Sequence, residues 1–323
     1  NCFAEIYMSN IVTKIEYLPW FDDHLTEMVN RYDSGKFPQS LLITGEQDIG
    51  KSIFANDIAK SILCLDRKDQ RACGKCQSCL WIDKNSHPDL LSITSEEKSH
   101  FIKVDQIRQL IQFAQMTSET GRKVIVIHNA HEMNLNAANA LLKTLEEPVA
   151  NCYLILVSSY PKKLPITITS RCQRQLLSVN GQNETILQWL ESQGLTVSRE
   201  VLQQLFALSY ERPILSYKFL SSDVMVTVNE LDKLLVRYLQ HRNNLKELSE
   251  FIDKNWQFAA HLILYWLAQA LKGNQDAGLV SQTLSERPAT ALLEYYEGFI
   301  KIIELSSTSV KQEWMIQEWL LKL

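Results

Sequence analysis

The sequence predicts an α/β domain followed by helices alone, which places the chain in the α/β plus all-α class. Short apolar runs alternate with amphipathic helical stretches through the first half of the chain, and the strand pattern ends near residue 180. From about residue 222, six helical segments follow, five of them rich in leucine and aromatic residues. Alternation of this kind is typical of a parallel sheet with helices on both faces.

The expected strands are short runs rich in valine, isoleucine and leucine, as in parallel strands that are buried on both faces. One of the helices between them places Ala137, Leu141 and Leu145 on a single stripe and ends before Pro148. We expect strands at 40–45, 89–94, 123–129, 152–159 and 174–179, and helices at 51–65, 104–117 and 134–147.

The length of 323 residues allows two or three domains, each with its own core. We predict an α/β domain of the nucleotide-binding type over 1–179, a small helical domain over 180–221 and a longer helical domain over 222–323. In the last of these, we interpret the stripes of leucine, tryptophan and tyrosine as core rather than as a ligand site.

The stretch "GEQDIGKS", from Gly45 to Ser52, follows an expected strand and opens an expected helix. This is the context of a phosphate-binding loop, in which glycines let backbone N–H groups converge on phosphate oxygens at a helix N-terminus. Gly50 is the second such glycine. Lys51 would reach the β and γ phosphates and Ser52 would bind Mg²⁺, so the sequence predicts a site for ATP with Mg²⁺.

The strand expected at 123–129 ends in His128 and Asn129, where a nucleotide hydrolase carries two carboxylates. One such acid positions Mg²⁺ and the other polarises the attacking water. An imidazole and an amide supply no anion, and Glu132 falls past the strand end. We therefore expect little or no ATP hydrolysis by this chain alone.

Four of the seven cysteines lie close together, at Cys64, Cys73, Cys76 and Cys79. Two CxxC turns share Cys76, and four thiolates can enclose a tetrahedral Zn²⁺ with no open position, so the predicted site is structural. An iron–sulfur cluster is chemically possible, but nothing else in the sequence indicates redox work. We interpret the remaining thiols as unliganded; they are Cys2, Cys152 and Cys172.

Composition limits which binding partners and which cellular compartment we expect for this chain. The net charge of −4 gives no overall basic field, so contact with DNA would need a local patch or a partner. No apolar run approaches the roughly 20 residues that span a bilayer. The N-terminus lacks the pattern of a secretory signal, and we interpret residues 1–7 as an extension ahead of Met8. A metal-type cysteine cluster then predicts a reducing, cytoplasmic location.

Five motifs together resemble one family. They are "PW" at 19–20, the loop at 45–52, the cysteine knuckle followed by "HPD" at 87–89, "NALLKTLEEP" at 139–148 and "SRCQ" at 170–173. The chain resembles the delta prime subunits of bacterial DNA polymerase III clamp loaders, a family within the AAA+ group. The last hundred residues match this family only in being helical.

The resemblance implies a stator role in a five-membered ring. Such a subunit joins three gamma/tau motor subunits and a delta subunit through its C-terminal helices, here the collar domain at 222–323, and the small domain at 180–221 would be the lid. The ring opens the sliding clamp and places it on primed DNA, as part of the DNA polymerase holoenzyme.

The resemblance also assigns roles to two arginines. Arg171 would be a trans-acting arginine finger that reaches the γ-phosphate of ATP in the neighbouring motor subunit, a task that suits an always-charged guanidinium. Arg212 aligns with the second sensor of the family and would face the nucleotide of this chain's own site. Around it, Ser209 and Pro213 depart from the motor-subunit pattern.

Two other functions compete with this one. An ATP-hydrolysing motor subunit of the same loader would need the carboxylates that are missing after the strand at 123–129. A stand-alone zinc-dependent nucleic-acid module would need basic and aromatic residues around the cysteines. Only Arg71 and Lys75 are charged between 71 and 79, and no aromatic residue lies among them.

Overall fold

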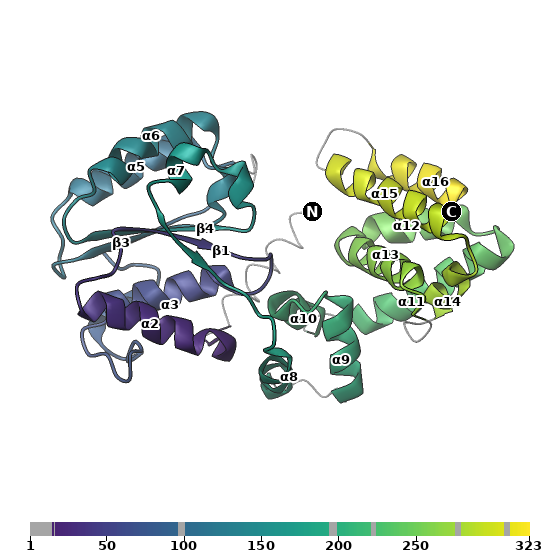
Figure 1. The fold of residues 1–323 in the computed structure, drawn as a ribbon, viewed down its shortest axis with the longest axis horizontal. Coiled ribbons are helices and arrows are strands. Elements are labelled where there is room, and N and C mark those ends of the chain that lie inside the picture. Colours follow the sequence, from purple (N-terminus) through teal and green to yellow (C-terminus); the bar gives the residue numbers. More distant parts are fainter. Residues whose placement is uncertain are drawn as a thin grey trace. The chain divides into compact units, whose positions relative to one another are not determined.

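The computed structural model describes residues 15, 17–95, 101–193, 199–220, 224–274, 279–306 and 311–323, and Figure 1 draws its ribbon. The chain forms two compact units. One contains residues 1–189 and 212–214, and the other contains residues 190–211 and 215–323. The finer division into three domains with boundaries at 179 and 221 stays a prediction.

The first unit is built on a five-stranded sheet, as the alternating pattern predicts. All neighbouring strands pair in parallel, in the order β2-β3-β4-β1-β5. Because β1 lies between β4 and the edge strand β5, the loop that follows β1 opens at the sheet's carboxyl edge with a strand on either side. The strands are β1 Ser40–Thr44, β2 Leu90–Ile93, β3 Lys123–Ile127, β4 Cys152–Ser158 and β5 Gln173–Leu176.

Helices cover both faces of this sheet, so β1 and β3 are buried at every residue. Figure 1 shows α2 and α3 on one face and α5, α6 and α7 on the other. Asn134 begins α6, where its side chain accepts a hydrogen bond from the N–H of Ala137 at 2.8 Å. These helices are α2 Asp22–Asp33, α3 Lys51–Leu63, α5 Val104–Gln115, α6 Leu135–Glu146 and α7 Ile166–Thr169.

Several elements, most of them short, were not expected from the sequence. They are the 3₁₀ turn η1 Pro19–Phe21, the helices α2 and α7, the helix α4 Gln77–Asp83 within the cysteine knuckle, and the 3₁₀ turns η2 Ala130–Glu132 and η3 Pro161–Lys163. In α2, Leu25, Met28 and Val29 are buried, and eight of its twelve residues are polar or charged. The three helices expected between strands are confirmed within a few residues of their predicted ends.

The second unit is helical, as predicted. Its core contains Leu231, Leu235, Ile263 and Phe299, so the apolar stripes are indeed core. Among the described residues, no helix is both long and apolar enough to cross a bilayer. The helices after the sheet are α8 Asn183–Ser192, α9 Arg199–Leu208, α10 Pro213–Leu220, α11 Val224–His241, α12 Leu245–Lys254, α13 Trp256–Leu271, α14 Leu279–Ser285, α15 Ala289–Leu305 and α16 Gln312–Lys322.

Candidate functional site

The loop from Gly45 to Ser52 joins β1 to α3, and both of its glycines are required by the fold. Their φ angles are +154° for Gly45 and +102° for Gly50, which side chains disfavour. A Cβ on Gly45 would lie 2.5 Å from the carbonyl oxygen of Leu177, and one on Gly50 would overlap the side chain of Leu18. The loop therefore has the backbone path that a phosphate-binding loop needs.

Contacts from distant parts of the chain hold this loop in place. The indole N–H of Trp20 donates to the carbonyl of Ile49 at 3.0 Å, and its ring packs edge-on against Trp189 with centroids 5.0 Å apart. The N–H of Ile214 donates to the carbonyl of Asp48 at 2.9 Å. The "PW" motif thus has a structural role, because its tryptophan fastens the middle of the loop.

Lys51 lies where the motif predicts, but its ammonium group is engaged inside the loop. The side chain is buried and donates to the carbonyl oxygen of Glu46. Burial lowers the pKa of Lys51 to about 8; Asp48 opposes this effect and the nearby Arg212 adds to it. The structure therefore brings Arg212 to the loop, and an incoming phosphate competes with a backbone carbonyl for Lys51. Ser52 is partly buried in the first turn of α3.

The end of β3 carries no anion, as the sequence predicts. The Nε2 atom of His128 lies 3.0 Å from the hydroxyl of Ser92, and burial lowers the pKa of this imidazole to about 4. It is therefore neutral near pH 7. Asn129 adopts φ +46° and starts the turn η2. Glu132 lies in that turn, past the strand end, where its carbonyl accepts the N–H of Ile102 at 2.9 Å.

His131 is a further residue of this site that the sequence did not single out. Its Nδ1 atom lies 3.2 Å from the hydroxyl of Ser158 at the end of β4, and its ring centroid lies 5.0 Å from that of Tyr160. Burial lowers the pKa of His131 to about 4, and the charges of Lys163 and Lys51 contribute. The edge of the sheet thus presents two neutral imidazoles, which cannot replace carboxylates in holding Mg²⁺.

Arg171 lies between α7 and β5, and its partners belong to neighbouring helices rather than to the phosphate loop. Its guanidinium forms an ion pair with Glu146 at 2.6 Å and donates to the carbonyl of Thr167 at 3.0 Å. The side chain is partly exposed, whereas the next residue, Cys172, is buried. The backbone is therefore anchored while the charged group stays at the surface.

The four predicted cysteines lie together. The Sγ atoms of Cys64, Cys73, Cys76 and Cys79 all fall within 4.8 Å of one another, and those of Cys64 and Cys76 are 3.8 Å apart. Tetrahedral zinc with bonds of about 2.3 Å separates its sulfur ligands by about 3.8 Å. Backbone N–H groups of Cys73 and Cys76 donate to the sulfurs of Cys64 and Cys73, both at 3.3 Å. The cluster therefore has the chemistry and spacing of a zinc site.

The other thiols are separate from this cluster where they are described. Cys152 and Cys172 are both buried and unpaired. Burial raises the pKa of each to about 11, so both are unreactive thiols at neutral pH. Cys2 lies outside the described residues.

The knuckle, residues 64–86, docks against α2 and α3 through charged groups. Its basic residues and the end of α4 pair with side chains of these two helices, and a small pocket lined by Asp57 and Lys60 lies at the junction. The three ion pairs are Lys60–Asp83, Arg67–Asp33 and Arg71–Asp22.

Asp57 should make stability depend on pH. Burial raises the pKa of its carboxyl group to about 7, and Arg71 and Lys60 offset this only in part. The folded state therefore binds the proton more tightly than the unfolded state, and the free energy of unfolding should fall as pH rises from about 4 to about 7. At pH 8, we expect the free energy of unfolding of Asp57→Asn to exceed that of wild type by about 1–3 kcal/mol. Near pH 4, the two free energies should be equal. Urea denaturation across this range measures the difference, and a pH-independent difference would contradict the assignment.

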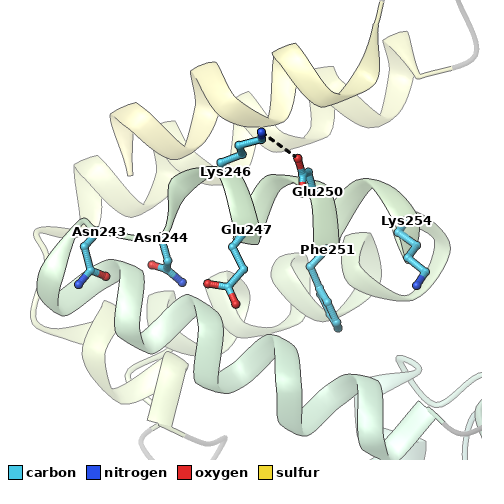
Figure 2. Close-up of a pocket in the computed structure, with 7 residues that line it drawn as sticks. All are labelled: Asn243, Asn244, Lys246, Glu247, Glu250, Phe251 and Lys254. Carbon is cyan, nitrogen blue, oxygen red and sulfur yellow. Dashed lines mark ion pairs between the residues drawn. The ribbon is translucent and has the colours of Figure 1, made fainter.

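An open groove of about 590 Å³ lies on the surface of α12 in the helical unit. Figure 2 shows Lys246 and Glu250 paired, at 3.7 Å, away from Glu247 and Phe251. The groove balances two lysines against two glutamates and includes none of the predicted site residues, so it indicates no particular ligand. Its lining residues are Asn243, Asn244, Lys246, Glu247, Glu250, Phe251 and Lys254.

Comparison with known proteins gives a consistent result. The family model described as "DNA polymerase III, delta subunit" matches residues 22–180. A protein named DNA polymerase III subunit delta' from Haemophilus influenzae is 31% identical over 79% of this chain and 77% of its own length. One of the same name from Pseudomonas aeruginosa is 39% identical over 54% of this chain, and the match spans about half of that relative, 53%.

A solved structure supports the fold independently. A DNA polymerase III gamma subunit-related protein from Thermotoga maritima superposes with a TM-score of 0.50 and is 17% identical, covering 93% of this chain and 97% of its own. At this identity the likeness concerns the fold alone. It agrees with the parallel sheet and the helical second half described above.

Proposed function

Because the chain belongs to the DNA polymerase III subunit delta' family, within the clamp-loader proteins, we propose that it is the stator of a bacterial clamp loader. In this role it would join gamma/tau motor subunits and a delta subunit in a five-membered ring. That assembly would open the sliding clamp and load it on primed DNA. The helical region 222–323 would supply the collar contacts, 180–221 the lid, and the setting would be the cytoplasm.

One observation carries the distinction between a stator and a motor. The phosphate loop is intact, but the neighbouring strand ends in His128, a neutral imidazole, and Asn129, an amide. Gly45, Gly50 and Lys51, with Ser52, would hold the phosphates and Mg²⁺ of ATP. No residue at the strand end can position the metal as an acid does or act as a base toward water. The chain would bind ATP and leave it largely uncut.

The proposed catalytic contribution of the chain is Arg171, acting on another subunit's nucleotide. Its guanidinium sits at the surface, held by Glu146 in an ion pair that a partner's phosphates can replace. Arg212, whose charge reaches Lys51, would act as the second sensor of this chain's own loop. The two arginines would therefore serve two different nucleotide sites.

The four-cysteine cluster would hold one structural Zn²⁺. The mutual spacing of the sulfurs supports this assignment, and four thiolate ligands leave no open position for catalysis. The metal would hold the knuckle closed, and the ion pairs to α2 and α3 would hold it against the α/β unit.

We expect the isolated chain to bind ATP weakly or moderately and to hydrolyse it at least 10²-fold more slowly than the roughly 1 s⁻¹ or faster of an active enzyme. The reason is that Lys51 and the loop are present while the acids after β3 are not. Binding would be measured by calorimetry and turnover by phosphate release, each with Lys51→Ala as the matched control.

Two outcomes would contradict this expectation. Turnover near 1 s⁻¹ that disappears in Lys51→Ala would make the chain a motor subunit, the competing function. Wild-type protein that binds no nucleotide would mean that the loop serves only as structure. In that case the loop would serve only to anchor Trp20 and Ile214 through their hydrogen bonds to its backbone.

A further inference from the structure

The "HPD" segment, His87 to Asp89, lies between helix α4 of the knuckle and strand β2. It contacts neither the phosphate loop nor Arg171 through any hydrogen bond described above. All the same, His87 and Asp89 are both buried, with 6% and 1% of their surface exposed. Buried polar side chains are usually held by hydrogen bonds, and the bonds of these two lead to the cysteine cluster.

His87 connects β2 to two cysteine-bearing segments. The backbone N–H of Asp89 donates to Nδ1 of His87 at 3.0 Å, so Nδ1 is the acceptor and the proton of the neutral ring is on Nε2. Nε2 then donates to the hydroxyl of Ser78 at 2.8 Å, and that hydroxyl donates to the carbonyl of Leu63 at 2.8 Å. Every donor in this relay has one acceptor.

The relay ends beside two of the four predicted metal ligands. Leu63 immediately precedes Cys64, and Ser78 immediately precedes Cys79. Cys64 and Cys79 are the two most buried of these four cysteines, with 3% and 0% exposed. The hydroxyl of Ser78 therefore links α4, which carries the last ligand, to the end of α3, which the first ligand follows, and the imidazole of His87 orients that hydroxyl.

Asp89 supports the segment of Cys64 through a second set of hydrogen bonds. Its carboxylate accepts the N–H groups of Glu119 and Thr120 at 3.1 and 2.7 Å and so orders the loop before β3. In that loop, Arg122 donates to the carbonyl of Cys64 at 3.1 Å. Two separate hydrogen-bonded paths therefore connect the sheet to the segment of Cys64. One runs through His87 and Ser78, and the other runs through Asp89 and the loop of Arg122.

We propose that His87 is a positioning residue for the four-cysteine site, setting the separation of Cys64 and Cys79 through Ser78. This inference rests on the zinc site proposed above. Partners that orient metal ligands without touching the metal typically change metal affinity 10–100-fold when they are removed. His87 differs from such partners only in acting through the backbone of the ligand-bearing segments.

Two substitutions of His87 test the contributions of its two ring nitrogen atoms separately. Asparagine can reproduce the acceptor at Nδ1 but does not reach Ser78, whereas glutamine places its amide N–H near the position of Nε2. We expect His87→Asn to raise the zinc dissociation constant about 10–100-fold, and His87→Gln to raise it less than about 10-fold. Ser78→Ala should behave like His87→Asn, and it keeps the test open if His87→Asn does not fold.

The full-length protein would be titrated with Zn²⁺ against a chelator, and with Co²⁺ to record the visible bands of tetrahedral thiolate coordination. Urea denaturation would be measured in parallel. The matched control is His128→Asn, which also removes an imidazole, here only partly buried, that contacts a serine hydroxyl, Ser92, at 3.0 Å in the same unit. That control should leave zinc affinity and the Co²⁺ bands unchanged.

The outcomes are distinct. Wild-type metal affinity in both His87→Asn and Ser78→Ala, equal losses in the glutamine and asparagine variants, or the same loss in His128→Asn would each overturn the role of His87 alone. Wild-type protein that takes up neither Zn²⁺ nor Co²⁺ would instead overturn the metal site itself, and the role of His87 with it.

Discussion

Arg171→Ala is expected to leave the chain folded and able to join the assembled loader, while lowering DNA- and clamp-stimulated ATP hydrolysis and clamp loading. The fold should persist because the side chain is partly exposed and its ion pair with Glu146 is at the surface, where such pairs contribute about 1 kcal/mol or less. Arginine fingers supplied in trans contribute roughly 10³–10⁵ to phosphoryl transfer. Only one of several motor sites would lose its finger, so clamp loading should fall more than ATPase activity.

Steady-state ATPase and clamp-loading rates of reconstituted rings measure this effect. Arg171→Lys should not restore activity, because an ammonium group lacks the planar fork of donors. Arg174→Ala is a matched control, since it removes an exposed arginine three residues away on β5. Glu146→Gln removes the resting partner but keeps the guanidinium, so it should retain activity. Equal rates for wild type and Arg171→Ala, with assembly intact, would reduce Arg171 to a structural residue.

The second large effect is expected at the cysteine cluster. Wild-type protein should contain one Zn²⁺ per chain, and Cys76→Ser should lose most of it because Cys76 belongs to both CxxC turns. Structural zinc contributes about 10–16 kcal/mol of binding free energy in small zinc domains. The loss should nevertheless be local. Residues 64–90 should exchange amide hydrogens faster, while the core around Leu42, Ile125 and Leu156 stays protected.

Elemental analysis and hydrogen exchange test this expectation. Cys172→Ala is the matched control, since this thiol is buried but outside the cluster. It should leave zinc content unchanged. Iron in the purified protein would contradict the zinc assignment. So would the absence of metal together with free reactivity of all four thiols.

The sequence predicted the central strands β1, β3 and β4 well because they are buried on both faces and are therefore almost continuously apolar. It predicted the longer helices because each places its apolar residues on one stripe that faces the core. The other elements were missed where that signal is weak. Eight of the twelve residues of α2 are polar or charged, and α4 is a seven-residue helix whose position depends on the knuckle. The exposed β5 was predicted to start one residue late and to end three residues late, because the apolar Leu177 and Val179 follow it.

For the candidate sites, local residues could be predicted from the sequence and distant partners could not. Local motifs predicted the glycines, Lys51 and the four cysteines, because backbone torsion and ligand spacing are properties of neighbouring residues. The sequence could not predict which distant groups would complete them. Trp20 reaches Ile49, and Arg171 reaches Glu146, across many residues of chain. Such partners depend on how the helices pack, which no local pattern specifies.

Mixing experiments test whether this chain is an assembly subunit of a clamp loader. Purified chain would be combined with gamma/tau and delta subunits and analysed by size-exclusion chromatography with light scattering. We predict a single complex with the mass of a five-membered ring containing one copy of this chain, and no such complex when the chain is left out. If the chain elutes alone under these conditions while the other subunits assemble without it, it is not an assembly subunit of the loader.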